Sequence, residues 1–205
     1  TRCLLRRCGE TLSAQRRTPS RLEGSPRAAN RERVNNVWTC ATCGDSHDGM
    51  ATVFGSRAPY SWEQATDGER AVGELNADVC ALTLGEATHF FVRGHLEIPI
   101  TDRGGETFIW SVWCSQSRES MTLAAQHWED PDRVALRPTF GWLDTALPYD
   151  PTTLGLPTHV HTSPPGMVPR IVVDPSADHP LVRDQQNGLT WHGVAELNRR
   201  LLKGE

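Results

Sequence analysis

The chain has 205 residues, enough for one domain with a hydrophobic core, and its hydrophobic content of 38% with seven Trp excludes a chain that is disordered throughout. No apolar run approaches the roughly 18 residues of a membrane-spanning helix, and the first 30 residues lack the apolar segment of a signal peptide. We therefore expect a soluble cytoplasmic protein without a membrane partner.

A basic N-terminal segment precedes an acidic body. Residues 1–33 contain nine Arg and three Glu, a net charge of +6, so the rest of the chain must carry −10 to give the formal total of −4. The segment has no aromatic residue and no sustained hydrophobic periodicity, so we interpret it as a disordered arm and do not expect it to bind nucleic acid. An alternative interpretation is that the arm is non-native upstream sequence and that the protein begins at Val34, which a GUG start codon would explain. We place a single domain over residues 34–205.

Hydrophobic patterns and turn residues divide this body into short elements. In chain order they predict a strand (37–40), a helix in two pieces (61–76), strands (80–84, 89–100, 107–115), a helix (117–130), strands (140–147, 158–162, 171–173) and two helices (179–187, 190–202). Ser61 and Ser117 are the expected N-caps, Gly68 the break between the helical pieces, and Gly188 a C-terminal cap. Gly94 predicts a kink or bulge in its strand.

The arrangement of these elements predicts the fold class. Strand hairpins in the middle and helices mainly towards the ends favour an α+β fold with a mainly antiparallel sheet, flanking helices and a Cys-x2-Cys knuckle at the N-terminal edge. Regular strand–helix alternation, GxGxxG and GxxxxGK[ST] are all absent from the sequence, which excludes the common nucleotide-binding patterns.

The first candidate site is Cys40-x2-Cys43-x3-His47, with Cys80 as a distant fourth ligand. Two thiolates separated by two residues can bind one ion, because the turn between them points both sulfurs inward. In a reducing compartment such cysteines favour a metal over a disulfide, so we predict a structural zinc. Two alternatives stay open: a pair of reduced thiols in a turn, and a thioredoxin-type redox pair. The redox pair is disfavoured because Gly44, Asp45 and Ser46 read as a loop where that motif requires a helix.

The second candidate site is a group of histidines and aspartates near the C-terminus. His159 and His161 alternate on a predicted strand and would face the same side, where Asp178 or Asp174 and His179 could complete a hydrolytic metal site. The simpler interpretation is that Asp178 is the N-cap of the following helix and that the histidines lie on an exposed strand.

Tryptophans could line a binding groove, although most are expected in the core. Trp110 and Trp113 are three positions apart on one strand and would face opposite sides, which predicts one core residue and one exposed residue.

Several stretches together resemble an uncharacterised bacterial family, the domain of unknown function DUF2199. The matching segments are 40–44 with His47, 78–80, 90–99, 110–113, 140–143 and 178–181 with Gln185 and Gly188. The resemblance covers about residues 38–202 and leaves the arm outside. Position 114 departs from the pattern, since Cys stands where a small or β-branched residue is expected. The resemblance implies that Cys40, Cys43, His47 and Cys80 belong together, and it implies no activity.

We therefore expect a bacterial α+β domain with a structural zinc knuckle, which binds a protein or small ligand through an acidic face that carries aromatic residues. The alternative is a metal-dependent hydrolase that uses His159, His161, Asp178 and His179.

Overall fold

A computed structural model describes residues 37–39 and 46–203. The predicted arm and the two knuckle cysteines, Cys40 and Cys43, lie outside the described residues.

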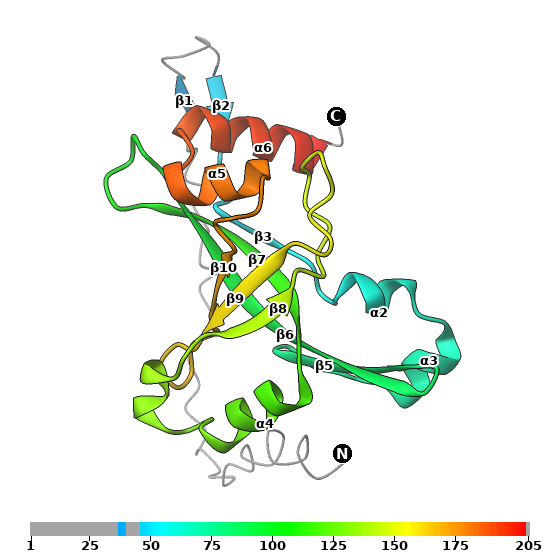
Figure 1. The fold of residues 1–205 in the computed structure, drawn as a ribbon. Helices are drawn as coiled ribbons and strands as arrows, with labels where there is room; N and C mark the ends of the chain where they lie inside the picture. The colour runs from blue at the N-terminus through cyan, green and yellow to red at the C-terminus, as the bar shows by residue number, and fades with distance from the viewer. Residues whose placement is uncertain (1–36, 40–45, 204–205) are drawn as a thin grey trace, which may run out of the picture.

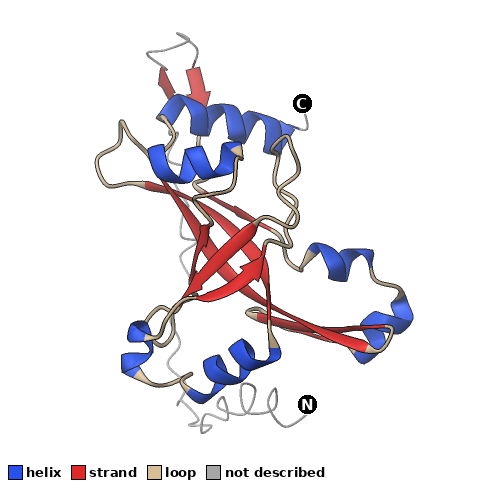
Figure 2. Cartoon of the chain, viewed as in Figure 1, coloured by secondary structure: helices blue, strands red, loops and turns tan. Residues whose placement is uncertain are grey.

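Five consecutive strands form the centre of the molecule. They are β6 (Ala87–Pro99), β7 (Thr107–Gln116), β8 (Thr139–Trp142), β9 (Pro157–His161) and β10 (Arg170–Val173). Neighbours along the chain are antiparallel: β6 pairs with β7, β8 with β9, and β9 with β10. An antiparallel bridge from Cys114 to Leu143 joins β7 to the end of β8, and Arg170 on β10 pairs in parallel with His95 on β6. The strands therefore close into a small barrel (Figure 2).

The parallel pair is a consequence of the number of strands. In a closed ring of five strands that reverse direction at every step, the first and last run the same way, so their pairing must be parallel. A further parallel pair joins β3 (Val53–Gly55) to β7 at the sheet edge. The α+β class follows from these strands and the flanking helices, and the sheet is mixed, where the sequence predicted a mainly antiparallel one.

Gly94 allows β10 to approach β6. A Cβ atom at this position would lie 2.6 Å from the Ile171 side chain and 2.7 Å from the carbonyl oxygen of Pro169. The pairing of β6 with β7 continues through Gly94 without the predicted bulge, and the glycine instead marks the place where two backbones meet closely. After the Arg170–His95 pair, the side-chain amide of Gln185 takes the place of a neighbouring strand for β10. It accepts a hydrogen bond from the Val173 N–H and donates one to the Ile171 carbonyl, each at 2.9 Å.

Two helices cover one end of the barrel. These are α5 (Pro180–Asn187) and α6 (Trp191–Lys203), which lie together at the top of Figure 1. Leu181 and Val194 are fully buried against the barrel interior, in one cluster with Leu96, Ile98, Phe108 and Trp110. Gly188 ends α5 at φ +80°, a conformation that favours glycine, as its predicted role as a C-terminal cap requires.

A second cluster lies outside the barrel, where β4 (Glu74–Leu75) and β5 (Val79–Leu84) extend the sheet beside α2 (Tyr60–Gln64) and α3 (Asp67–Val72). Trp113 is fully buried here against Phe91, Leu82 and Cys80. Its indole N–H donates to the Ser56 carbonyl at 3.2 Å. Trp110 and Trp113 do face opposite sides of β7, but the prediction that one is exposed is wrong, because a separate core covers each face.

Three local predictions need correction. The helical break lies at Ala65–Thr66 and not at Gly68, because the Thr66 side chain and Glu69 form a capping box that starts α3. Ser61 lies inside α2, which has no side-chain cap, and its hydroxyl and N–H bind the Asp144 carboxylate. Ser46, expected in a loop, begins β2 (Ser46–Asp48), which pairs antiparallel with β1 (Val37–Thr39).

The opposite end of the barrel is covered by α4 (Arg118–Gln126) and a short 3-10 helix, η1 (Pro131–Ala135). Ser117 caps α4 as predicted, accepting a hydrogen bond from the Ser120 N–H. Over residues 37–39 and 46–203, none of the helices combines the length and the apolar character that crossing a bilayer would require.

We predict that Gly94→Ala lowers the free energy of unfolding by about 1–3 kcal/mol, because the added methyl group must displace Ile171 or the β10 backbone. Urea denaturation monitored by tryptophan fluorescence measures the change. Gly104→Ala is the matched control, since a Cβ there meets nothing within 4 Å. Equal stability of the two variants would contradict the close approach of β10 to β6.

Candidate ligand-binding site at the lower mouth of the barrel

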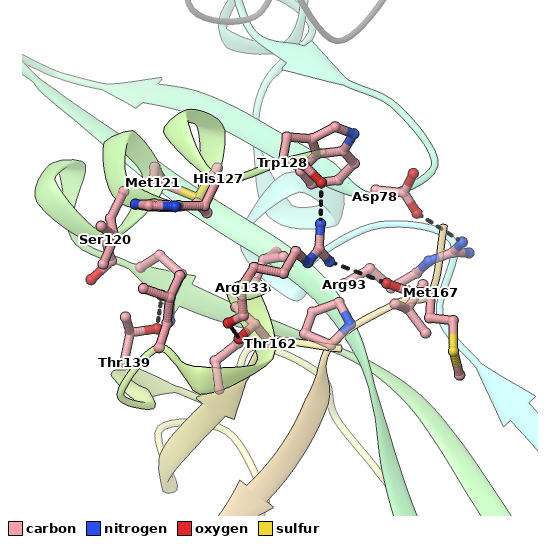
Figure 3. A pocket seen from close by; sticks show the side chains of 18 of the residues that line it. Asp78, Arg93, Ser120, Met121, His127, Trp128, Arg133, Thr139, Thr162 and Met167 are labelled. Carbon is pink, nitrogen blue, oxygen red and sulfur yellow. Dashed lines mark hydrogen bonds and ion pairs between the residues drawn. The ribbon is translucent and has the colours of Figure 1, made fainter. Parts of the chain in front are cut away.

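A cavity of about 270 Å³ lies between the lower mouth of the barrel and the segments that cover it (Figure 3). Its walls come from β6, β9, α4, η1 and the connection between β9 and β10. About half of the lining side chains are apolar: Val92, Met121, Leu123, Ala124, Trp128, Leu136, Val160, Met167, Val168 and Pro169. Small-molecule sites are commonly apolar hollows of this kind with a few polar groups, and barrel mouths are among their usual locations.

Arg133 is the buried polar residue of this wall. Its side chain leaves η1, which begins where the Asp130 carboxylate caps the Asp132 N–H and Pro131 occupies the first turn. Arg133 is only 5% exposed, and its guanidinium donates to the carbonyl oxygens of Trp128 (2.7 Å), Ser163 (2.6 Å) and Met167 (3.4 Å). Figure 3 shows the guanidinium in the middle of the cavity-lining side chains.

The charge of Arg133 is not neutralised by a neighbouring carboxylate. Among residues 37–39 and 46–203, none of the ion pairs includes Arg133. Carbonyl dipoles and the face of Trp128, 5.2 Å from the guanidinium carbon, offset part of the desolvation cost. A buried positive charge that faces an apolar cavity is therefore available to an anion.

A second arginine borders the same cavity. Arg93 lies on β6, and its guanidinium contacts the Asp78 carboxylate at 3.4 Å. The Arg93 Nε atom is buried and has no hydrogen-bond partner among the described residues. Asp78 is held in place through its backbone, since its N–H donates to the Asn76 side chain and its carbonyl accepts from the Arg93 N–H, both at 2.8 Å.

His127 is the titratable imidazole of the cavity wall, and it is engaged with Asp130. The two side chains are 2.8 Å apart, and the hydrogen bond from His127 is the main cause that lowers the pKa of the Asp130 carboxyl group. Asp130 therefore stays ionised at neutral pH and holds His127 beside the cavity.

Of the predicted hydrolytic site, the structure brings His159 close to Asp174 and His161, while Asp178 and His179 have other partners. His159 lies 3.1 Å from Asp174, whose pKa is lowered to about 2 by hydrogen bonds from Ser176 and then from His159. His161 has a lowered pKa because of burial and the nearby charge of Arg170. Asp178 is exposed and pairs with Arg183 at 3.4 Å.

His179 has a structural role. It is 2% exposed, its Nδ1 accepts from the Leu181 N–H at 3.0 Å, and its Nε2 lies 2.9 Å from the Pro151 carbonyl. His179 is thus the N-cap of α5, the role predicted for Asp178, and both ring nitrogens are used. Over the part of the chain that the structure describes, no three His, Cys, Asp or Glu side chains form a group that could hold a metal ion.

The zinc knuckle stays a prediction. Cys40 and Cys43 lie outside the described residues, and His47 is known only as a backbone position in β2, opposite Trp38. Cys80 lies in β5, at the lower arm of Figure 1, whereas β1 and β2 appear at the top of that view. Cys80 is 1% exposed, and burial raises the pKa of its thiol to about 12.

Aromatic residues are found in the candidate site and on the surface. Trp128 lines the cavity, while Phe140 and Trp142 form an edge-to-face pair on the outer face of β8, 47% and 51% exposed. Arg133 was missed by the sequence analysis, because an arginine between acidic and proline residues is typical of a solvated loop. Its burial depends on carbonyl groups that come from a distant part of the chain.

The barrel and its cavity define the class of this molecule: a small β-barrel domain with helices at both ends and a candidate ligand site at one mouth. Residues 39–189 match the model of the family described as "Uncharacterized protein conserved in bacteria (DUF2199)", and the chain belongs to this family. The resemblance inferred from the sequence is thereby confirmed. Comparisons with curated proteins and with solved structures gave no match.

We predict that Cys80 and Cys114 resist alkylation in the native protein at about pH 8, because burial raises the pKa of each thiol to about 12 and keeps it protonated. Iodoacetamide labelling followed by peptide mass spectrometry measures the reaction, with urea-unfolded protein as the control in which both residues react. Native-state labelling of Cys80 as fast as in the unfolded chain would contradict its burial.

For the knuckle, we predict about one zinc ion per chain in the purified protein and its loss in Cys43→Ala. Inductively coupled plasma mass spectrometry of both proteins measures the metal content. Cys114→Ala is the control that should retain the metal, because Cys114 is fully buried inside the barrel. A folded wild-type protein without metal would exclude the knuckle.

Proposed function

We propose that this domain binds a small organic anion with an apolar body in the cavity at the barrel mouth, and that Arg133 binds the acidic group. The observation that supports this most strongly is the buried guanidinium of Arg133, which has carbonyl partners but no carboxylate partner among the described residues. An acid in the cavity would supply the missing negative charge. A charge-assisted hydrogen bond in a desolvated site is stronger than one between neutral groups.

The rest of the lining supports an apolar ligand body. Met121 and Met167 can adapt to irregular shapes, because their side chains are flexible and polarizable. Trp128 adds an aromatic wall that Arg133 already contacts. The volume of about 270 Å³ is just below the roughly 300–1,000 Å³ of ligand pockets, which favours a small metabolite over a peptide.

This proposal keeps the binding class that the sequence indicates, with a small molecule as the partner. It assigns binding to a cavity instead of the acidic aromatic-bearing surface. The zinc ion, if present, would stabilise the N-terminal edge and take no part in ligand binding.

We predict that alkanoic or phenylalkanoic acids bind the wild-type protein and that their primary amides, which have the same shape without the charge, bind about ten- to a hundredfold more weakly. Isothermal titration calorimetry with each acid and amide measures the affinities. In Arg133→Gln the preference for the acid should disappear.

The control is Arg183→Gln, which removes an exposed arginine on α5 and should keep the preference. Circular dichroism melting identifies any loss of folding in Arg133→Gln, because this residue also holds three backbone carbonyls. Equal affinities for acid and amide in the wild-type protein would contradict the proposal.

A further inference from the structure

We propose that the ligand carries two acidic groups joined by an apolar spacer, and that Arg93 binds the second group in exchange for Asp78. This inference rests on the proposed function and specifies its ligand class: an α,ω-dicarboxylate.

Arg93 is held in position but its guanidinium is not saturated. Its backbone is fixed within β6, where the Arg93 N–H donates to the Asp78 carbonyl at 2.8 Å. Its side chain is 31% exposed, and the buried Nε atom has no partner among the described residues. A buried N–H without an acceptor costs free energy that a bound acceptor would recover.

The existing ion pair is loose. The terminal nitrogen of Arg93 lies 3.4 Å from the Asp78 carboxylate, whereas charge-assisted hydrogen bonds between arginine and carboxylate are usually about 2.7–2.9 Å. The Asp78 carboxylate contacts one terminal nitrogen of Arg93 and makes no hydrogen bond with the Arg93 Nε atom. A carboxylate that lies along the edge of the guanidinium would bind Nε and the terminal nitrogen together, the two-bond geometry that arginine favours.

Arg133 and Arg93 offer two separate positions for an acid in the cavity wall, which Arg137 and Glu129 also line. Arg133 has no carboxylate partner among the described residues, so the first acid neutralises it. Arg93 is shared with Asp78, whose side chain is 45% exposed and can turn into solvent at little cost. The second acid replaces Asp78 and forms the closer contact. Both arginines line the same cavity, and apolar side chains such as Met167 and Val168 lie in the same wall (Figure 3).

If the second acid replaces Asp78, a substitution of Asp78 should change the affinity for the dicarboxylate. Asp78→Asn keeps the backbone hydrogen bonds that position the turn but removes the competing charge. The variant should therefore bind a dicarboxylate more tightly than the wild-type protein does. Loss of a structural contact alone would weaken binding or leave it unchanged.

The experiment is calorimetric titration with a series of aliphatic α,ω-dicarboxylates of increasing length and the monoamide of each. At the best length the wild-type protein should bind the dicarboxylate about tenfold or more tightly than its monoamide. Arg93→Gln should abolish this advantage, and Arg93→Lys should reduce it, because lysine keeps the charge but cannot form the two-bond contact. Asp78→Asn should increase it several-fold, and Arg183→Gln, distant from the cavity, should leave it unchanged.

The possible results separate the two proposals. Monoamides that bind as tightly as dicarboxylates would overturn the second acid position and leave the Arg133 site intact. A dicarboxylate advantage that persists in folded Arg93→Gln, or that falls in Asp78→Asn, would overturn the assignment to Arg93. Failure of both series to bind the wild-type protein would overturn both proposals.

Discussion

The close approach of β10 to β6 is the constraint on which the rest of this structure depends. Five strands that reverse direction at each step can form a ring only if the last pairs in parallel with the first, and this pairing occurs where Gly94 leaves room for Ile171. Closure buries apolar side chains of β6, β7, β9 and β10, with Leu143 just after β8, in one core. It also leaves the barrel with two ends, one covered by α5 and α6 and the other by the segments around the cavity (Figure 1).

The position of the cavity follows from this strand order. In a meander barrel every second connection lies at the same end, so the segment from β7 to β8 and the segment from β9 to β10 cover the same mouth. Arg133 joins the two, because it donates to Trp128 in its own connection and to Ser163 and Met167 in the other. One side chain thus holds the cavity wall together and places a positive charge against an apolar interior.

Much of the fold could be predicted from the sequence, because strand alternation, the caps at Ser117 and Gly188 and the family resemblance depend on local patterns. The barrel closure could not, since it depends on a single parallel pairing between strands far apart in the chain. For the same reason one of Trp110 and Trp113 was expected to be exposed, although the barrel core covers Trp110 and the β5 extension covers Trp113. The site was harder to predict, because the burial of Arg133 and the unsatisfied Nε of Arg93 are created by tertiary contacts and have no signature in the sequence.

Ligands are expected to bind in the cavity beside α4 and η1 and not at the end that α5 and α6 cover, and the indole N–H resonances of tryptophan test this directly. Trp128 lines the cavity, whereas Trp191 starts α6 at the opposite end of the barrel. In a two-dimensional nitrogen–proton NMR titration with an organic acid, the account predicts a saturable shift of the Trp128 indole resonance while that of Trp191 stays in place. A shift of Trp191 with Trp128 unchanged would contradict it.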